Sequence, residues 1–270
     1  MHRIIISLAV VFLAASAVTA RAQSAQPTSP RTAPAATRSQ ADCGGFISGS
    51  AVSRDLFVVG GEDDDTHSVV RQFHTGNSVY LASRGKQEYA VGTEYSVIRP
   101  AKDIFGTVRY SGQTGEINRL GTPFEDVGRV RVTHVSSEGT VAQVTFACIP
   151  VAFGDILVPY FPRPIPQYTM NPRVDRFTPT DEKKTHGFIV AATNNYGVVG
   201  KGNIVYLNLG ESNGIAPGSR MRIYKELAQA SIPPETLGEA IVLSVHEYSC
   251  VAIIVDSFRE ISAGDRVEEE

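Results

Sequence analysis

The 270-residue chain lacks a large excess of charge of either sign, and after its first 22 residues it lacks any apolar run long enough to cross a membrane. Its formal net charge is −3. A general nucleic-acid binder would need a concentrated basic face. The sequence therefore argues against nucleic acid as a partner and against a transmembrane segment in the folded part of the chain.

Signatures of catalysis and of metal binding are also missing. His246 begins a pattern typical of a zinc-protease helix, but Cys250 stands where the second histidine is needed. Residues 197–202 resemble a phosphate-binding loop, but no Ser or Thr follows Lys201. The histidines are scattered without metal-ligand spacing. We therefore expect no enzyme, no cofactor and no metal ion, with a hydrolase of unrecognised site as an alternative.

The first 22 residues are typical of a secretion signal. His2 and Arg3 form the charged end, an apolar segment follows, and small residues at positions 18–22 provide cleavage sites. No cysteine follows the apolar segment, so a lipid anchor is not expected. The sequence predicts an exported protein of the periplasm or cell envelope, not a lipoprotein, with no transmembrane segment after signal cleavage.

Residues 23–42 consist mainly of Ser, Thr, Ala, Pro and Gln and contain no large apolar side chain. Such a segment cannot bury enough surface to offset the entropy lost on ordering it. We interpret it as a disordered tether that holds the folded part away from a membrane or wall, or as a disordered terminus with no role.

The remainder of the chain is a tandem duplication. Residues 76–98 align without a gap with residues 202–224, and residues 128–158 align with residues 238–268. The two offsets differ because the first copy carries an insertion. Tyr80 and Tyr206 lie in the same Val-Tyr-Leu triplet and are therefore expected at equivalent positions.

Each copy contains five or six short β-rich runs joined by polar turns with glycine, a pattern that favours a small closed barrel over a sandwich. The opening strand of the first barrel is expected at residues 44–49, matching residues 187–190. The predicted fold class is all-β: a tandem duplication of a small five- to six-stranded β-barrel joined by a Pro-rich linker. The predicted domains are a first β-barrel with an insertion loop (43–158), a Pro-rich linker (159–185) and a second β-barrel (186–270).

The insertion in the first copy, residues 105–123, contains four glycines among polar residues. It is predicted to be a long loop or flap over the first barrel. Binding residues concentrate on long ordered loops, so Arg109, Tyr110 and Arg119 are the candidate partner contacts. A passive flap is the alternative.

The chain has three cysteines. Cys43 and Cys148 bracket the first barrel, and their counterparts in the second copy are Thr185 and Phe258, so both are absent there together. Disulfides persist in exported proteins. We predict a disulfide between Cys43 and Cys148 and a buried free thiol at Cys250.

Several motifs of the second copy carry a family resemblance. These are residues 205–210, the turn at residues 214–218 and the closing segment at residues 261–267. Together they resemble the C-terminal β-barrel of the flagellar assembly protein T family and the barrel repeats of uncharacterised exported bacterial envelope proteins. The resemblance implies a fold and carries over no catalytic residue.

The expected function is that of a non-catalytic cell-envelope scaffold, in which paired barrels act as an assembly adaptor. A binding module for peptidoglycan or another wall polysaccharide is the alternative. The expected partner is accordingly an envelope protein or peptidoglycan.

Cleavage of the predicted signal would determine the mass of the mature protein. The mature protein should begin near Arg21 or Gln23, because the small residues before them suit signal peptidase. Intact-mass spectrometry of the exported protein measures this. A mass that still contains residues 1–20 would contradict the prediction.

Overall fold

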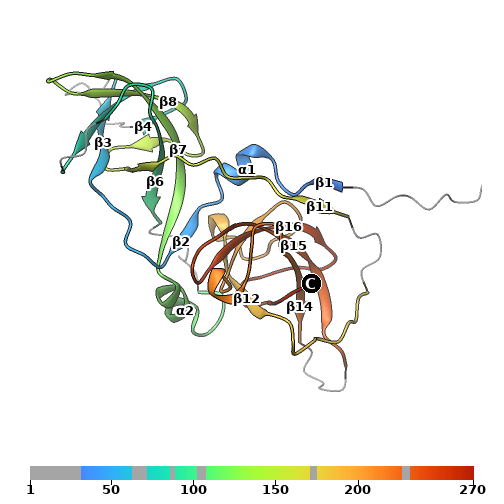
Figure 1. Cartoon of the computed structure of the whole chain (residues 1–270). Helices are drawn as coiled ribbons and strands as arrows, with labels where there is room; N and C mark the ends of the chain where they lie inside the picture. The colour runs from blue at the N-terminus through green and yellow to red at the C-terminus, as the bar shows by residue number, and fades with distance from the viewer. Residues whose placement is uncertain (1–31, 63–71, 86–88, 102–107, 171–174, 227–231) are drawn as a thin grey trace, which may run out of the picture.

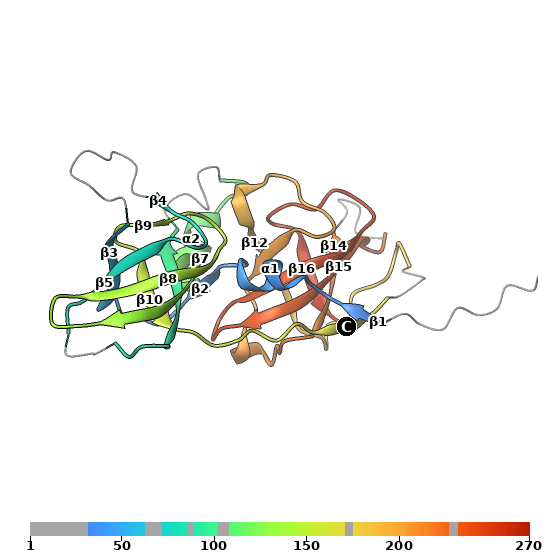
Figure 2. The same ribbon diagram turned by 90° about the horizontal axis from the view of Figure 1, so that it is seen from above.

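The computed structural model describes residues 32–62, 72–85, 89–101, 108–170, 175–226 and 232–270. The predicted signal, residues 1–22, lies outside them. Two β-barrels lie side by side along the long axis of the molecule (Figures 1 and 2). The all-β, tandem two-barrel fold is thereby confirmed.

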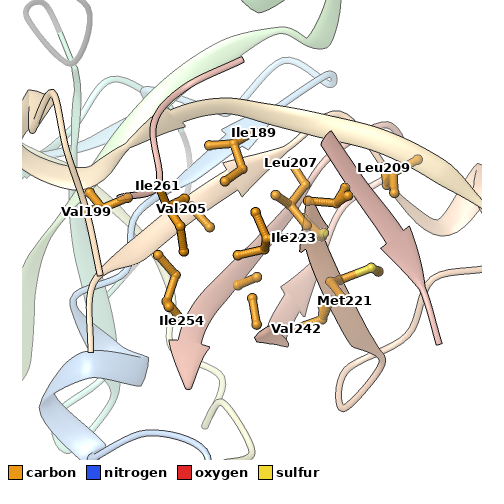
Figure 3. Packing of buried hydrophobic residues seen from close by; sticks show 14 of the residues in the cluster. Ile189, Val199, Val205, Leu207, Leu209, Met221, Ile223, Val242, Ile254 and Ile261 are labelled. Atoms are coloured by element: carbon orange, nitrogen blue, oxygen red, sulfur yellow. The ribbon is translucent and has the colours of Figure 1, made fainter. Parts of the chain in front are cut away.

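The second barrel is closed in the strand order β12-β13-β16-β15-β14-β17. Its strands are β12 (His186–Ala192), β13 (Ile204–Leu207), β14 (Arg220–Lys225), β15 (Glu235–Val245), β16 (Cys250–Ser257) and β17 (Arg266–Glu269). Two short 3-10 turns, η1 (Thr193–Asn195) and η2 (Glu211–Asn213), lie in its connections. Alternate side chains such as Val205, Leu207 and Ile223 fill the interior (Figure 3).

The first barrel has the strand order β3-β5-β8-β7-β6-β10 and closes where β10 pairs with β3. Its strands are β3 (Leu56–Gly61), β5 (Ser78–Ser83), β6 (Glu94–Pro100), β7 (Thr122–Val135), β8 (Thr140–Ala147) and β10 (Ile156–Pro159). A two-stranded sheet, β4 (Gln72–Phe73) with β9 (Val151–Ala152), accompanies it.

The two barrels match strand for strand. Tyr80 lies opposite Gly60, directly after an irregularity between β3 and β5. Tyr206 lies opposite Ala191, directly after the same irregularity between β12 and β13. The expected equivalence of Tyr80 and Tyr206 is confirmed.

The predicted opening strand of the first barrel was wrong. The strand that matches β12 is β3, because Val58 exchanges backbone hydrogen bonds with the Gly154 turn as Ile189 does with the Gly264 turn. The segment expected there contains instead β2 (Phe46–Ser48), an extra strand paired with the start of β7. The short run Gly-Phe-Ile recurs in both copies, but hydrogen-bond register decides which strand closes a barrel.

Residues 23–31 of the predicted disordered tether lie outside the described residues, and residues 32–42 are ordered. β1 (Thr32–Pro34) pairs with β11 (Gln167–Thr169), and α1 (Arg38–Asp42) begins with a capping box between Thr37 and Gln40. Ala35 and Ala36 are buried against the second barrel. Their small side chains are enough to order the segment, because another part of the chain supplies the apolar surface on which they pack. Composition alone does not reveal such a surface.

The insertion loop is likewise corrected. Instead of a flap over the first barrel, it forms α2 (Gln113–Leu120), which packs against β12 of the second barrel (Figure 1). Ile117 and Leu120, three positions apart on one helix face, are buried in the same cluster as β12. Gln113 donates from Nε2 to the Val190 carbonyl at 2.7 Å.

These segments cover an apolar outer face of the second barrel. All four residues of β13 are buried, whereas the matching residues of β5 alternate between buried and accessible. The difference follows from sequence, because four outward positions that are apolar in the second barrel are polar in the first. The pairs are Ile204 with Ser78, Ile241 with Arg131, Ile253 with Gln143 and Val255 with Thr145. Tyr206 is consequently 2% exposed and Tyr80 44%.

The predicted disulfide between Cys43 and Cys148 is confirmed, with Cα atoms 5.6 Å apart, and Cys250 is a buried free thiol. The bond joins the end of α1 to the first barrel. Gln40 in α1 donates to the Gly202 carbonyl of the second barrel at 3.0 Å. The disulfide therefore holds the covering segment where it contacts both barrels.

We expect the double variant Cys43→Ser, Cys148→Ser to lose about 4–5 kcal/mol of unfolding free energy, because the bond closes a loop of 105 residues. Chemical denaturation measures the loss. The variant should be insensitive to reductant, whereas the parent protein should be destabilised by it. Non-reducing peptide mapping that finds Cys250 bridged would contradict the assignment.

Candidate functional site

The three sequence-predicted contacts do not form one exposed site. The Arg109 guanidinium lies beside Gly197 of the second barrel, where an added Cβ would be 2.9 Å from it. The Tyr110 ring packs edge-to-face on Phe188, and burial raises the pKa of Tyr110 to about 12. Arg119 is exposed and paired with Glu116 at 2.6 Å. Two of the three thus face the neighbouring barrel.

The junction between the barrels is organised by the carboxylate of Asp126, on β7. It accepts hydrogen bonds from the Gly45 backbone at 2.7 Å and from both terminal nitrogens of Arg163, one of them at 2.8 Å. Arg163 also donates to the Ala41 carbonyl at 3.1 Å. One carboxylate that is almost fully buried therefore connects the first barrel, the segment after α1 and the linker.

Gly45 at this junction requires glycine for two reasons. Its φ is +65°, in the left-handed region, and an added Cβ would lie 2.6 Å from the Tyr206 hydroxyl oxygen. That hydroxyl donates to the Gly44 carbonyl at 2.9 Å. Burial raises the pKa of Tyr206, so the hydroxyl stays protonated as a donor.

Two adjoining hollows open at the junction, and together we call them the junction groove. The inner hollow, of about 180 Å³, is lined by the disulfide, Glu125, Asp126, Asn194 and Tyr206, among others. The outer hollow, of about 290 Å³, is lined by Gln40, Asn194, Tyr196 and Asn203, among others. Cys43, Thr193 and Asn194 line both hollows, so the groove is continuous around Asn194.

The chemistry of the junction groove is that of amides, hydroxyls and carboxylates. None of the described residues that line it is Lys or Arg. Asn194 has a φ of +58°, the only positive φ among the described non-glycine residues. Strained backbone of this kind concentrates at functional sites. The groove therefore suits a polar ligand that carries no concentrated negative charge.

A separate hollow of about 670 Å³ lies on the outside of the first barrel. Tyr80, Val59, Ala82, Val141 and His134 contribute to its wall. This is the face whose counterpart on the second barrel is covered by β2, by α2 and by Gly44, which accepts a hydrogen bond from Tyr206. It is open in the first barrel, so two surfaces of the molecule are available for binding.

Within the described ranges, no three His, Cys, Asp or Glu side chains gather closely enough to hold a metal ion. No helix in the same part of the chain has the length and apolar composition needed to span a bilayer.

No protein-family model matches the chain, and no curated protein matches its sequence. The resemblance to the flagellar assembly protein T family therefore stays a prediction.

Sequence reasoning missed the junction groove, because Glu125 comes from one copy and Asn194 from the other. The sequence did contain one indication of the groove, namely the Asn-Asn pair that follows β12 and ends that strand.

The ring of His246 lies at the junction, and its protonation makes the stability of the protein depend on pH. It stacks on Phe46 with ring centroids 5.1 Å apart, and its pKa is lowered first by burial and then by the charge of Arg163, against weaker opposing effects of Glu211 and Asp126. A histidine with a lowered folded pKa is neutral in the folded state. Its stabilising contribution is complete above its unfolded pKa and is lost as pH falls below about 6.5.

We therefore expect the unfolding free energy to fall between pH 7 and pH 5, and we expect His246→Phe to reduce that fall while keeping a ring against Phe46. Denaturant titration at each pH measures both. His134→Phe, on the exposed face of the first barrel, is the matched control and should leave the dependence in place. Equal slopes for the parent and His246→Phe would contradict the assignment.

Proposed function

We propose that this chain is a non-catalytic, exported cell-envelope protein that acts as a two-barrel adaptor. The observation that supports this most directly is that the same barrel face is buried in one copy and open in the other. The second barrel uses its face internally, to fix the two barrels as one unit. The first barrel presents its face, centred on Tyr80, to a partner.

The covered face of the second barrel indicates what the open face would accept. There, Ile47 of the short strand β2 inserts its side chain into the outer cluster, and its carbonyl accepts a hydrogen bond from Ser249 Oγ at 3.0 Å. An extended segment with one apolar side chain thus suits this kind of barrel face. The proposed partner is an envelope protein that presents such a segment to Tyr80.

Export is supported by the disulfide, because a bond between Cys43 and Cys148 persists in an oxidising compartment and is rare in the cytosol. The signal-like residues 1–22 support the same location. The absence of catalytic motifs in the sequence supports binding rather than turnover.

Photo-crosslinking in intact cells tests the adaptor role. A benzoylphenylalanine at position 80 should form one defined adduct with an envelope protein, and mass spectrometry should place the crosslink in an extended apolar segment. Tyr248, 42% exposed on the hairpin between β15 and β16, is the matched control position. No adduct at position 80, or the same adducts at both positions, would overturn the proposal.

Peptidoglycan or another wall polysaccharide is the second candidate partner, favoured by the polar lining of the junction groove. Sedimentation of the mature protein with purified peptidoglycan separates the two functions. A pure protein adaptor stays in the supernatant, whereas a wall-binding protein sediments with the peptidoglycan.

A further inference from the structure

We propose that the junction groove is a binding site for an uncharged saccharide, held between Glu125 of the first barrel and Asn194 and Tyr196 of the second. This inference deepens the second candidate function and does not depend on the adaptor role of the Tyr80 face. It assigns a ligand class to a site that only exists when both barrels are in place.

The floor of the groove is rigid before any ligand arrives. The disulfide fixes one wall, Tyr206 donates to the Gly44 carbonyl, and Asp126 is already engaged by Arg163 and the Gly45 backbone. These groups therefore shape the hollow without being displaced. Ligand sites are usually preformed and occur preferentially at domain interfaces, and a preformed site needs little ordering on binding.

The rim of the groove keeps unused hydrogen-bonding capacity. Within the described residues, the side chains of Asn194 and Glu125 form no hydrogen bond, while the neighbouring Gln40 and Asn203 are engaged with backbone groups. An amide offers two donors and an acceptor, and a carboxylate offers acceptors only. Sugar hydroxyls can donate to the carboxylate and exchange hydrogen bonds in both directions with the amide.

Tyr196 supplies the third element of the site. It lines the outer hollow together with Asn194 and is 50% exposed, so part of its side chain is accessible to a ligand. Tyrosine combines an apolar ring with a polar end. The C–H face of a pyranose can lie on such a ring while its hydroxyls reach Asn194 and Glu125.

The charge of the lining selects among polar ligands. Arg163 compensates the charge of Asp126, so Glu125 is the uncompensated carboxylate of the inner hollow; no described lining residue is basic, and phosphate, sulfate and nucleic acid are therefore disfavoured. Among the described residues that line the groove, only Ile149 and Ile204 offer a large aliphatic contact to an apolar ligand. An uncharged saccharide fits both the hydrogen-bonding groups and the electrostatics.

The test is calorimetric titration of the full mature chain with a linear β-1,4-linked N-acetylglucosamine tetramer. Asn194→Gly is the sharpest variant, because glycine adopts the positive φ freely and only the amide is removed. We expect it to keep or raise the melting temperature and to weaken binding about two- to tenfold, as the loss of a neutral hydrogen bond implies. Tyr196→Ala should weaken binding as well.

Tyr80→Ala is the matched control: it removes a ring of similar exposure from the first barrel and should leave saccharide affinity unchanged, and crosslinking from position 80 is a separate measurement on a separate face. The saccharide proposal and the adaptor proposal can therefore be refuted independently of each other. Absence of binding to the tetramer, or full affinity in both Asn194→Gly and Tyr196→Ala, would overturn the saccharide site. Tighter binding of a glucosamine tetramer, with its free amines, or of a peptide would overturn the assignment to an uncharged saccharide.

Discussion

The structure depends on one requirement, namely that the apolar outside of the second barrel be removed from water. A closed barrel normally buries only its interior, and its outward positions are polar. Here Ile204, Ile241 and Ile253 point outward, and burying side chains of this size is worth about 1.5–3 kcal/mol each. The cover consists of segments that precede the first barrel or interrupt it, together with Ile165 and Tyr168 of the linker, so the two barrels are joined by hydrophobic packing as well as by the chain connection.

Polar contacts give that packing a single geometry. Hydrophobic cover alone is non-directional, whereas the Asp126 carboxylate accepts only where the Gly45 backbone and the Arg163 guanidinium converge. Removing one partner of a buried ion pair costs far more than the pair itself contributes, because the other charge is left without compensation. The Asp126 carboxylate therefore fixes the relative position of the segments at the junction, because a displaced arrangement would leave its charge without compensation.

The sequence alone correctly predicted the features that are encoded within a single copy of the repeat. The Val-Tyr-Leu triplets placed Tyr80 and Tyr206 correctly, and the paired absence of two cysteines from the second copy identified the disulfide. It failed where a segment is stabilised by a distant surface. Ile117 and Leu120 provide only one apolar pair in a glycine-rich insertion, too little to predict a helix, and the junction groove requires the relative placement of both barrels. The candidate site thus depends on tertiary contacts that no local pattern encodes.

The position of β2 and α1 in the chain has a kinetic consequence. These residues precede both barrels in the chain, yet the surface they cover is built from β12, β13, β15 and β16, near the other end of the sequence. Pairing segments so distant in sequence is slow, because loop closure must precede the contacts that compensate for it. Until the second barrel forms, Phe46 and Ile47 have no apolar surface from it to pack on. A covalent link at Cys43 to the first barrel shortens this search, since it holds the covering segment beside the place where the second barrel forms.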